Sequence, residues 1–551
     1  MPDAPDPKTR RNRTAPGRWF RAAWLATLAA LALAATAAAQ VLPPPEPSAD
    51  AARGPGARPA PAETSPERAA TAGAAAENGR RGGLPADATT RHVLELPDGR
   101  TLAFTATAGS LRLFDPRDGR TPQADVAYLA YALEGAAPRT RPVSFVLNGG
   151  PGASSAWLQL GALGPWRLPL AGDAALPSAA PEPVPNAETW LDFTDLVFLD
   201  PVGAGYSDFA PGAGEAARRR LWSVDGDVQS LAEVVRRWLE EHGRLASPKF
   251  LVGESYGGFR VPRMARVLQS EQGIGVNGLV LISPALDFGG RSAALDPLLW
   301  VARLPSMAAA ARAAAGGEVD RATLAEAERY AAGDYLLDLL RAERDAEAAA
   351  RLGERVAALT GLDPELVRRR RGRVGMAEFL HAIGGAGDRV ASPYDASVTV
   401  LDPFPEVPAE ARPRPDPVLD GMLAPLTGAM LGLYAERLGW RPEGRQYRLL
   451  NRRVAREWDW GGGRGPRPEA MSSLRTALAL DPRLRVVVAH GLFDLVTPYF
   501  ASRLLLDQIP ERSGGDRVRL VAYPGGHMFY SLDGSRAALR AEARALVAAG
   551  R

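Results

Sequence analysis

Short apolar runs separated by longer polar segments are the feature that most limits how this chain can fold. Runs of this kind, without strict alternation, occupy residues 144–148, 196–200, 250–253, 279–283, 485–490 and 518–523. They are typical of strands buried on both faces of a parallel sheet. Between the second and third runs, DVQSLAEVVRRWLEEH repeats apolar residues at helical spacing, and Asp227 can cap its start. Alternating strands and helices predict an α/β fold with a parallel sheet.

The segments on either side of these first runs follow other patterns. HVLELPDG, RTLAFTATAG and SLRLFDPRDG alternate apolar and polar residues around Asp-Gly turns, which predicts antiparallel hairpins, and ADVAYLAYALE predicts one more strand. Between the fourth and fifth runs, Ala- and Arg-rich helical patterns dominate, which predicts a helical insertion over the sheet. The expected division is an α/β core in two parts, 89–285 and 446–551, and a helical cap, 286–445.

The first 39 residues have the layout of a secretory signal peptide. A basic stretch precedes an apolar run, Ala22 to Ala39, which ends in three alanines before Gln40. The alternative is an uncleaved membrane anchor, because the run approaches the minimum spanning length. Residues 40–88 are rich in Pro, Ala and Gly and are expected to form a disordered linker. We therefore expect an exported protein, periplasmic or extracellular, without stable membrane insertion once the signal is cleaved.

Charge and cysteine content exclude several classes of function. The net charge is +3, and the first 39 residues, with six basic and two acidic side chains, contribute +4 of it, so the remainder carries −1. Nucleic acid is therefore not expected as a partner. Without cysteine, the chain has no disulfide, thiol nucleophile or thiolate metal site. No His/Asp/Glu spacing suggests a metal, and no Gly-rich loop has a phosphate-binding pattern, so no cofactor is expected.

The motif GESYG places Ser255 at a candidate nucleophile elbow. It follows the apolar run 250–253 and precedes FRVPRMARVLQSEQ, which can form a helix. This strand–turn–helix needs small neighbours, because the serine backbone is strained and its side chain must stand clear. Gly253, Gly257 and Gly258 meet that need. The alternative is an ordinary glycine-rich turn with a surface serine.

A nucleophilic serine needs a base, and the base needs an orienting acid. Of five histidines, His527 lies just after the last apolar run, where groups at the carboxyl ends of parallel strands gather. Asp494 follows the fifth run, and the order Ser, Asp, His is that of α/β-hydrolases. A structural loop histidine and a turn-capping aspartate are the alternative interpretations. His490 remains a second candidate for the base.

Acyl transfer also needs donors for a developing oxyanion. The backbone N–H of Tyr256, directly after the serine, is one candidate. The loop NGGPG, after the run 144–148, is the candidate for the other, because Gly149 and Gly150 have no side chains to obstruct an approach.

Several motifs together resemble the serine carboxypeptidases, and more particularly their bacterial branch. They are NGGPGASS (148–155), DPVGAGYSD (200–208), GESYGG (253–258), the Asp494 loop and the GGHM loop, in register from about residue 90 to the C-terminus. The resemblance implies an α/β-hydrolase fold with an N-terminal antiparallel β extension and a large helical cap. It implies hydrolysis of the C-terminal peptide bond through an acyl-enzyme, with Ser255, Asp494 and His527 as the triad. It also implies oxyanion donation from Gly150 and Tyr256.

The resemblance further implies that Asn148 and Glu254 bind the terminal carboxylate of the substrate. Two carboxylates brought together share a proton, so such a site favours mildly acidic pH. Two residues near this carboxylate-binding site depart from the family pattern. Ala162 stands where many relatives have a glutamate that shares this proton network, and Arg260 follows GESYGG where His-Tyr is common. We expect Arg260 either to alter substrate preference or to point to solvent.

The expected substrates are peptides with a free C-terminus. An esterase or acyltransferase with the same triad is one alternative, since a fold does not determine its substrate. A non-catalytic envelope binding protein that retains the fold is another. The preferred C-terminal residue and the oligomeric state do not follow from the sequence.

Overall fold

A computed structural model of the chain describes most residues after position 82. The described ranges are 83–169, 177–178, 180–289, 296–384, 388–407, 416–461 and 468–550. All of them belong to one compact unit, Pro66–Arg551, which is considered by itself. The expected signal peptide, 1–39, lies outside the described residues, and so does the expected linker up to residue 82.

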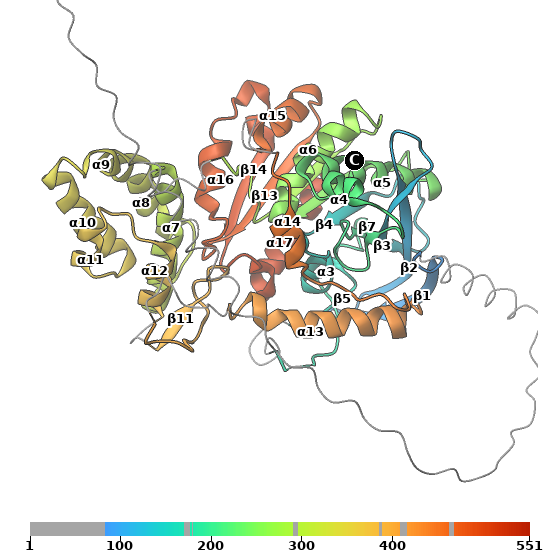
Figure 1. The fold of residues 1–551 in the computed structure, drawn as a ribbon, viewed down its shortest axis with the longest axis horizontal. Helices are drawn as coiled ribbons and strands as arrows, with labels where there is room; N and C mark the ends of the chain where they lie inside the picture. The colour runs from blue at the N-terminus through green and yellow to red at the C-terminus, as the bar shows by residue number, and fades with distance from the viewer. Residues whose placement is uncertain are drawn as a thin grey trace, which may run out of the picture. The chain divides into compact units, whose positions relative to one another are not determined.

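One large mixed sheet forms the centre of the fold (Figure 1), in the order β1-β2-β3-β7-β4-β9-β10-β13-β14 with β8 paired to β3. Its strands are β1 Ala88–Glu95, β2 Thr101–Phe114, β3 Pro122–Leu133, β4 Val143–Leu147, β7 Asp195–Leu199, β8 Asp208–Phe209, β9 Lys249–Glu254, β10 Gly278–Ile282, β13 Arg485–Gly491 and β14 Val518–Tyr523. Strands β7 to β14 along this order run parallel, and β1, β2 and β3 are antiparallel. The predicted fold class, an α/β-hydrolase with an antiparallel N-terminal extension, is confirmed.

Helices cover both faces of this sheet. The core helices are α3 Ala156–Leu158, α4 Glu215–Leu221, α5 Val224–Glu241, α6 Tyr256–Ser270, α14 Arg452–Glu457, α15 Met471–Leu480, α16 Tyr499–Leu506 and α17 Asp533–Ala549. In β4, Phe145 and Leu147 pack toward α5, α6 and α15, whereas Val146 packs toward α17 and toward α13, Leu419–Gly432. A strand that is apolar on both sides needs cover on both sides, which explains the unbroken apolar runs.

Shorter turns complete the core. These are the π-helical turn η1 Gln159–Leu163, the 3₁₀ turns η6 Glu511–Ser513, η7 Gly515–Arg517 and η8 Phe529–Ser531, and the two-stranded pair β5 Trp166–Arg167 with β6 Val184–Pro185. Helix α5 begins one turn earlier than predicted. Its cap is Ser223, whose hydroxyl accepts from the N–H of Gly226 at 3.1 Å, so the expected cap, Asp227, lies inside the helix.

The long segment between β10 and β13 is largely helical. It contains α7 Pro297–Ala314, η3 Ala322–Leu324, α8 Ala325–Tyr330, η4 Ala331–Tyr335, α9 Leu336–Arg341, α10 Ala346–Thr360, α11 Pro364–Arg369, α12 Met376–Ile383, α13 Leu419–Gly432 and η5 Leu433–Arg437, with the small pair β11 Arg389–Ala391 and β12 Thr399–Leu401. Helices α7 to α12 share an apolar cluster with Phe493 and Tyr499 of the core. Asp363 caps α11, and Pro364 opens it.

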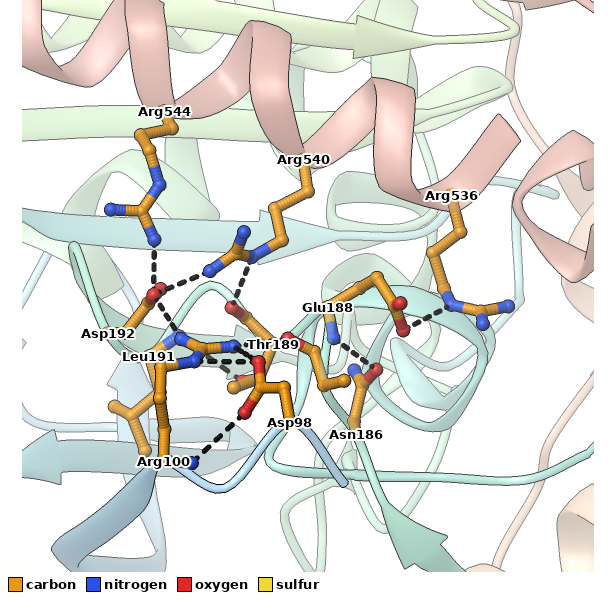
Figure 2. Close-up of polar contacts among 11 residues, drawn as sticks. Asp98, Arg100, Asn186, Glu188, Thr189, Leu191, Asp192, Arg536, Arg540 and Arg544 are labelled. Carbon is orange, nitrogen blue, oxygen red and sulfur yellow. Dashed lines mark hydrogen bonds and ion pairs between the residues drawn. The ribbon is translucent and has the colours of Figure 1, made fainter. Parts of the chain in front are cut away.

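A cluster of arginines around Asp192 ties the C-terminal helix to the N-terminal strands (Figure 2). One carboxylate oxygen of Asp192 forms ion pairs with Arg100 at 2.6 Å, with Arg540 at 2.5 Å and with Arg544. Arg100 stands at the entrance to β2, and the other two arginines belong to α17. Segments from opposite ends of the chain therefore meet at a single acidic side chain. Among the described helices, none combines the length and apolar character needed to cross a membrane.

Candidate active site

Ser255 occupies the sharp turn between β9 and α6. Its backbone has φ 60° and ψ −120°, a left-handed conformation that is strained for a residue with a side chain. The N–H of Ser255 donates to the carbonyl of Ile282 at 2.9 Å, and its carbonyl accepts from Gly258 at 2.9 Å. A Cβ on Gly253 would lie 2.2 Å from the carbonyl oxygen of Gly257, so only glycine fits there. The predicted requirement for small neighbours thus has a direct steric cause.

The structure brings His527 and Asp494 together in the loops that follow β14 and β13. Nδ1 of His527 lies 2.7 Å from Oδ2 of Asp494, and both residues are buried. This arrangement leaves Nδ1 as the donor to the carboxylate and Nε2 as the nitrogen that can accept a proton. The N–H of His527 donates to the carbonyl of Tyr394, and its own carbonyl accepts from the hydroxyl of Ser283 at 2.8 Å. The ring is therefore held at its backbone as well as at its side chain.

Asp494 is a fully buried acid that remains ionised. Burial raises its pKa, but His527 and the hydrogen bonds of Thr497 outweigh that effect, so the pKa lies below its usual range. The hydroxyl of Thr497 donates to Oδ2 at 2.6 Å, and its N–H donates to Oδ1 at 2.9 Å. Sequence reasoning missed Thr497. An aspartate followed three residues later by threonine is a common local bonding pattern, and this spacing was the available signal.

The glycine-rich loop after β4 packs directly against the elbow. A Cβ on Gly149 would lie 2.5 Å from the backbone nitrogen of Tyr256 and 2.7 Å from the carbonyl of Glu254. Gly150 has φ 101°, which favours glycine. Tyr256 is the first residue of α6, and N–H groups in a first helical turn have no acceptor within the helix. The two expected oxyanion donors, Gly150 and Tyr256, thus border the same pocket as Ser255.

Arg260 lies beneath this loop and does not reach solvent. Its side chain is 0% exposed, and Nε donates to Asp227 at 2.6 Å. Nη1 donates to the backbone carbonyl of Asn148 at 2.6 Å, and the guanidinium lies 5.0 Å from the ring centre of Tyr256. The expectation that Arg260 points to solvent is wrong. The sequence could not reveal this, because its partner Asp227 comes from a different helix.

Asn148 and Glu254 are buried side by side next to Ser255. Nδ2 of Asn148 donates to Oε2 of Glu254 at 2.5 Å, and Oδ1 of Asn148 accepts from the N–H of Leu158 at 3.1 Å. The bond from Leu158 occupies the amide oxygen and turns the amide NH₂ group toward the carboxyl. Both side chains line the pocket that contains Ser255.

Glu254 has a second partner, Tyr530, which sequence reasoning missed. The hydroxyl of Tyr530 lies 3.0 Å from both carboxyl oxygens of Glu254. Burial is the main influence and raises the pKa of Glu254 to about 7, against the opposing effects of His527, Tyr530 and Asn148. Ala162, where the family resemblance implies an acid, is buried in η1. The sequence carried no signal for Tyr530, which lies 276 positions from Glu254.

The pocket around Ser255 has a volume of about 150 Å³. Its remaining lining is mostly apolar, and it consists of Ala153, Trp157, Ala285, Phe288, Tyr394, Leu419, Leu450, Val496 and Met528, with Thr497 among them. Trp157 thus lines the pocket, whereas Trp166 packs in the core against Phe104. His490 is not part of this lining: it is buried in β13, and its Nε2 lies 2.9 Å from the hydroxyl of Ser502.

Burial lowers the pKa of His490 to about 4, so this histidine is neutral at ordinary pH. It faces Ser502 instead of Ser255, which leaves His527 as the base that the geometry favours. Within the described residues, no group of three or more His, Asp or Glu side chains could hold a metal ion.

Residues 123–307 match the family model described as serine carboxypeptidase. Over this segment the chain is similar to the serine carboxypeptidases. The matched segment contains Asn148, Gly150, Glu254, Ser255 and Tyr256, and it ends before Asp494 and His527. Those last two residues are brought to the pocket by the fold.

Curated relatives include two proteins of Arabidopsis thaliana. Serine carboxypeptidase-like 5 is 31% identical over 169 residues, which cover 28% of this chain and 36% of the relative. Serine carboxypeptidase-like 3 is 33% identical over 165 residues, covering 27% of this chain and 34% of the relative. The chain therefore spans about a third of the length of the curated relatives it matches.

Among solved structures, the prohormone-processing carboxypeptidase Kex1(delta)p of Saccharomyces cerevisiae has 14% sequence identity and a TM-score of 0.47, over 81% of this chain and 90% of that one. A proline iminopeptidase of Mycobacterium smegmatis has 16% identity and a TM-score of 0.34, over 80% of this chain and 98% of that one. Membership of a bacterial branch of the family stays a prediction.

Proposed function

We propose that this protein is a serine carboxypeptidase that removes residues from the C-terminus of peptides through an acyl-enzyme. The observation that supports this most directly is the buried pair Asn148 and Glu254, which lines the same pocket as Ser255. A buried acid that holds a proton beside the nucleophile gives the pocket a hydrogen-bond donor for a substrate carboxylate. The apolar remainder of the pocket suits a side chain on the terminal residue.

In the proposed mechanism, Ser255 attacks the carbonyl carbon of the last peptide bond. His527 takes the hydroxyl proton and later delivers it to the leaving amine, while Asp494 stabilises the protonated ring. The N–H groups of Gly150 and Tyr256 stabilise the oxyanion. A water molecule, activated by His527 in the same way, then hydrolyses the ester at Ser255. The peptide is released one residue shorter.

The proposed role of Glu254 depends on its protonation. A carboxylate substrate meets repulsion from an ionised Glu254, but a protonated Glu254 donates a hydrogen bond to it. Because burial raises the pKa of Glu254 to about 7, the acid holds its proton through the mildly acidic range. Asn148 offers a second donor to the same group. Recognition of a free C-terminus should therefore weaken as the pH rises past neutrality.

The test compares one blocked dipeptide that ends in a free carboxylate with its C-terminal amide, from mildly acidic to mildly basic pH. We expect at least a tenfold preference in kcat/KM for the free acid on the acidic side, which corresponds to about 1.4 kcal/mol of differential binding. Ser255→Ala is the control that must abolish turnover of both. Equal rates on acid and amide would contradict the proposal and favour an esterase or amidase.

A matched ester extends the same test to the alternatives. Turnover of the ester without turnover of either peptide would favour the esterase or acyltransferase. Failure of an active-site serine probe to label Ser255 in folded protein would favour a non-catalytic binding protein.

We also propose that the protein is exported to the periplasm or the extracellular space. The support is the basic, apolar and small-residue order of the first 39 residues. N-terminal sequencing of protein recovered from fractionated cells tests this. A chain that begins at Gln40 in the exported fraction supports the proposal, whereas a full-length chain in the membrane fraction supports an uncleaved anchor.

A further inference from the structure

We propose that Tyr530 is a positioning residue for Glu254: as a neutral donor it orients the carboxyl group toward the substrate and sets the pH at which a free C-terminus ceases to be recognised. This rests on the proposed carboxypeptidase function. It adds a residue outside the pocket lining and assigns it a measurable effect on substrate choice.

The contact between Tyr530 and Glu254 is fixed by the packing of the ring and by a backbone hydrogen bond. The hydroxyl of Tyr530 lies 3.0 Å from each carboxyl oxygen of Glu254, and the tyrosine is fully buried. Its ring is confined by η1, since a Cβ on Gly161 would lie 2.7 Å from a ring carbon of Tyr530. Its backbone carbonyl accepts from Arg536 at 3.1 Å. Both ends of the residue are thus held, and the hydroxyl is directed at Glu254.

The charged groups that act on Glu254 are Asp494 and His527. The end of β4 supplies Asn148, which is neutral, and the residues of η1 include no titratable side chain. The loops after β13 and β14 supply Asp494 and His527, whose charges act on Glu254 in opposite directions. Turn η8 supplies Tyr530, whose pKa burial raises well above 10. Tyr530 therefore stays neutral throughout the range in which Glu254 exchanges its proton.

A neutral partner has a different effect from a second acid. Two acids in contact titrate together, and the shared proton holds one of them neutral over a wide range. A tyrosine hydroxyl donates to the ionised form and so favours ionisation of Glu254. In this site, one acid titrates alone, and Tyr530 limits how far burial raises its pKa. Loss of the hydroxyl should extend recognition of free carboxylates to higher pH.

The orientation of the carboxyl gives a second consequence. With Tyr530 and Asn148 both donating to Glu254, the group cannot rotate freely about its last bond. Without the hydroxyl, only the bond to Oε2 from Asn148 remains to orient it. KM for free-acid substrates should therefore rise at acidic pH, where Glu254 is protonated in both proteins.

The experiment measures kcat/KM against pH for the free-acid dipeptide and its amide, in the wild type and in Tyr530→Phe. For the free acid, we expect Tyr530→Phe to have a several-fold higher KM at acidic pH. We also expect its kcat/KM to decline at a pH roughly one unit higher than in the wild type, because one pKa unit corresponds to the strength of one hydrogen bond to a charged group. The amide profile should keep its shape, because it has no carboxylate to bind. Tyr523→Phe is the matched control: Tyr523 packs against Phe529 and has no bond to Glu254, and its profile should equal that of the wild type.

Gly161→Ala provides a second variant, should Tyr530→Phe fail to fold. The added methyl group displaces the ring of Tyr530 and should shift the free-acid decline in the same direction. A KM raised equally at every pH, or an unchanged profile in both variants, overturns the proposal and leaves Tyr530 a packing role. Equal wild-type rates on the free acid and the amide would instead contradict the proposed carboxypeptidase function. This measurement needs no variant, so the two failures can be told apart.

Discussion

The guanidinium of Arg260 donates to the backbone carbonyl of Asn148 across 2.6 Å, within the core and out of reach of solvent. This bond joins α6, which begins directly after Ser255, to the loop that carries Gly150. Its other end is the carboxylate of Asp227 in α5. Three elements from separate parts of the chain are thereby held around the pocket.

The first prediction concerns this pair. Arg260→Met leaves Asp227 buried without its partner and should lower the free energy of unfolding by about 3–5 kcal/mol. The double variant Asp227→Leu/Arg260→Met removes both charges and should recover most of that loss, because a buried ion pair contributes little net stability. Its kcat should remain reduced at least tenfold on acid and amide alike, since the loop has lost its donor. Denaturant unfolding and steady-state kinetics check this, and a double variant with full kcat would show that the loop needs no such bond.

The second prediction concerns Asp494. Asp494→Asn should lower kcat by about four orders of magnitude, because an amide in this place favours the wrong tautomer of His527. The folded structure should persist, as Thr497 and Val496 can still bond the amide oxygen. Asp363→Asn, at the exposed start of α11, is the control and should keep wild-type kcat. Comparable activity of the two variants would rule out Asp494 as the orienting acid.

The third prediction concerns the pH dependence of stability. Burial raises the pKa of Glu254 from 4.5 to about 7 and that of Asp200 from 3.8 to about 7. Between those values the folded chain binds more protons than the unfolded chain, so the free energy of unfolding should fall as the pH rises toward 7. Glu254→Gln should reduce this slope and raise stability at neutral pH by about 3 kcal/mol at most. Urea unfolding from about pH 5 to 8 measures it, with Asp200→Asn as the companion variant.

A slope that both substitutions leave unchanged would contradict this account of the two acids. Activity separates them further. Glu254→Gln should lose the pH-dependent preference for free acids, whereas Asp200→Asn should retain it, since Asp200 accepts from the N–H of Ser155 and does not line the pocket.

The fourth prediction concerns the arginine cluster in Figure 2. Asp192→Asn removes the acid that Arg100, Arg540 and Arg544 share, and the three cations then repel one another. Unfolding free energy should fall by about 1–3 kcal/mol, and added salt should recover part of it. Asp533→Asn, whose side chain is 81% exposed, should cost less than about 1 kcal/mol. Equal effects in the two variants would show that Asp192 does not tie α17 to the strands.

Much of the fold could be predicted because it depends on local pattern. The six apolar runs all became parallel strands, and 518–523 matches β14 residue for residue. Hydrophobic period and turn chemistry involve neighbours within a few residues, so a single sequence contains them. The predicted start of α5 was wrong because two side chains could accept from the first N–H groups of the helix. Ser223 caps it, and Asp227 pairs with Arg260 instead.

The sequence by itself determined the chemistry that lies within motifs: a serine at a glycine-bounded turn, and an acid and a histidine after later strands. Only the tertiary structure decided what surrounds them. Tyr530 reaches Glu254, and Arg260 bonds Asn148, because the parallel order β4-β9-β10-β13-β14 brings the carboxyl ends of these strands to the same edge of the sheet. Contacts between residues so far apart depend on packing across the whole sheet, and no local pattern records them.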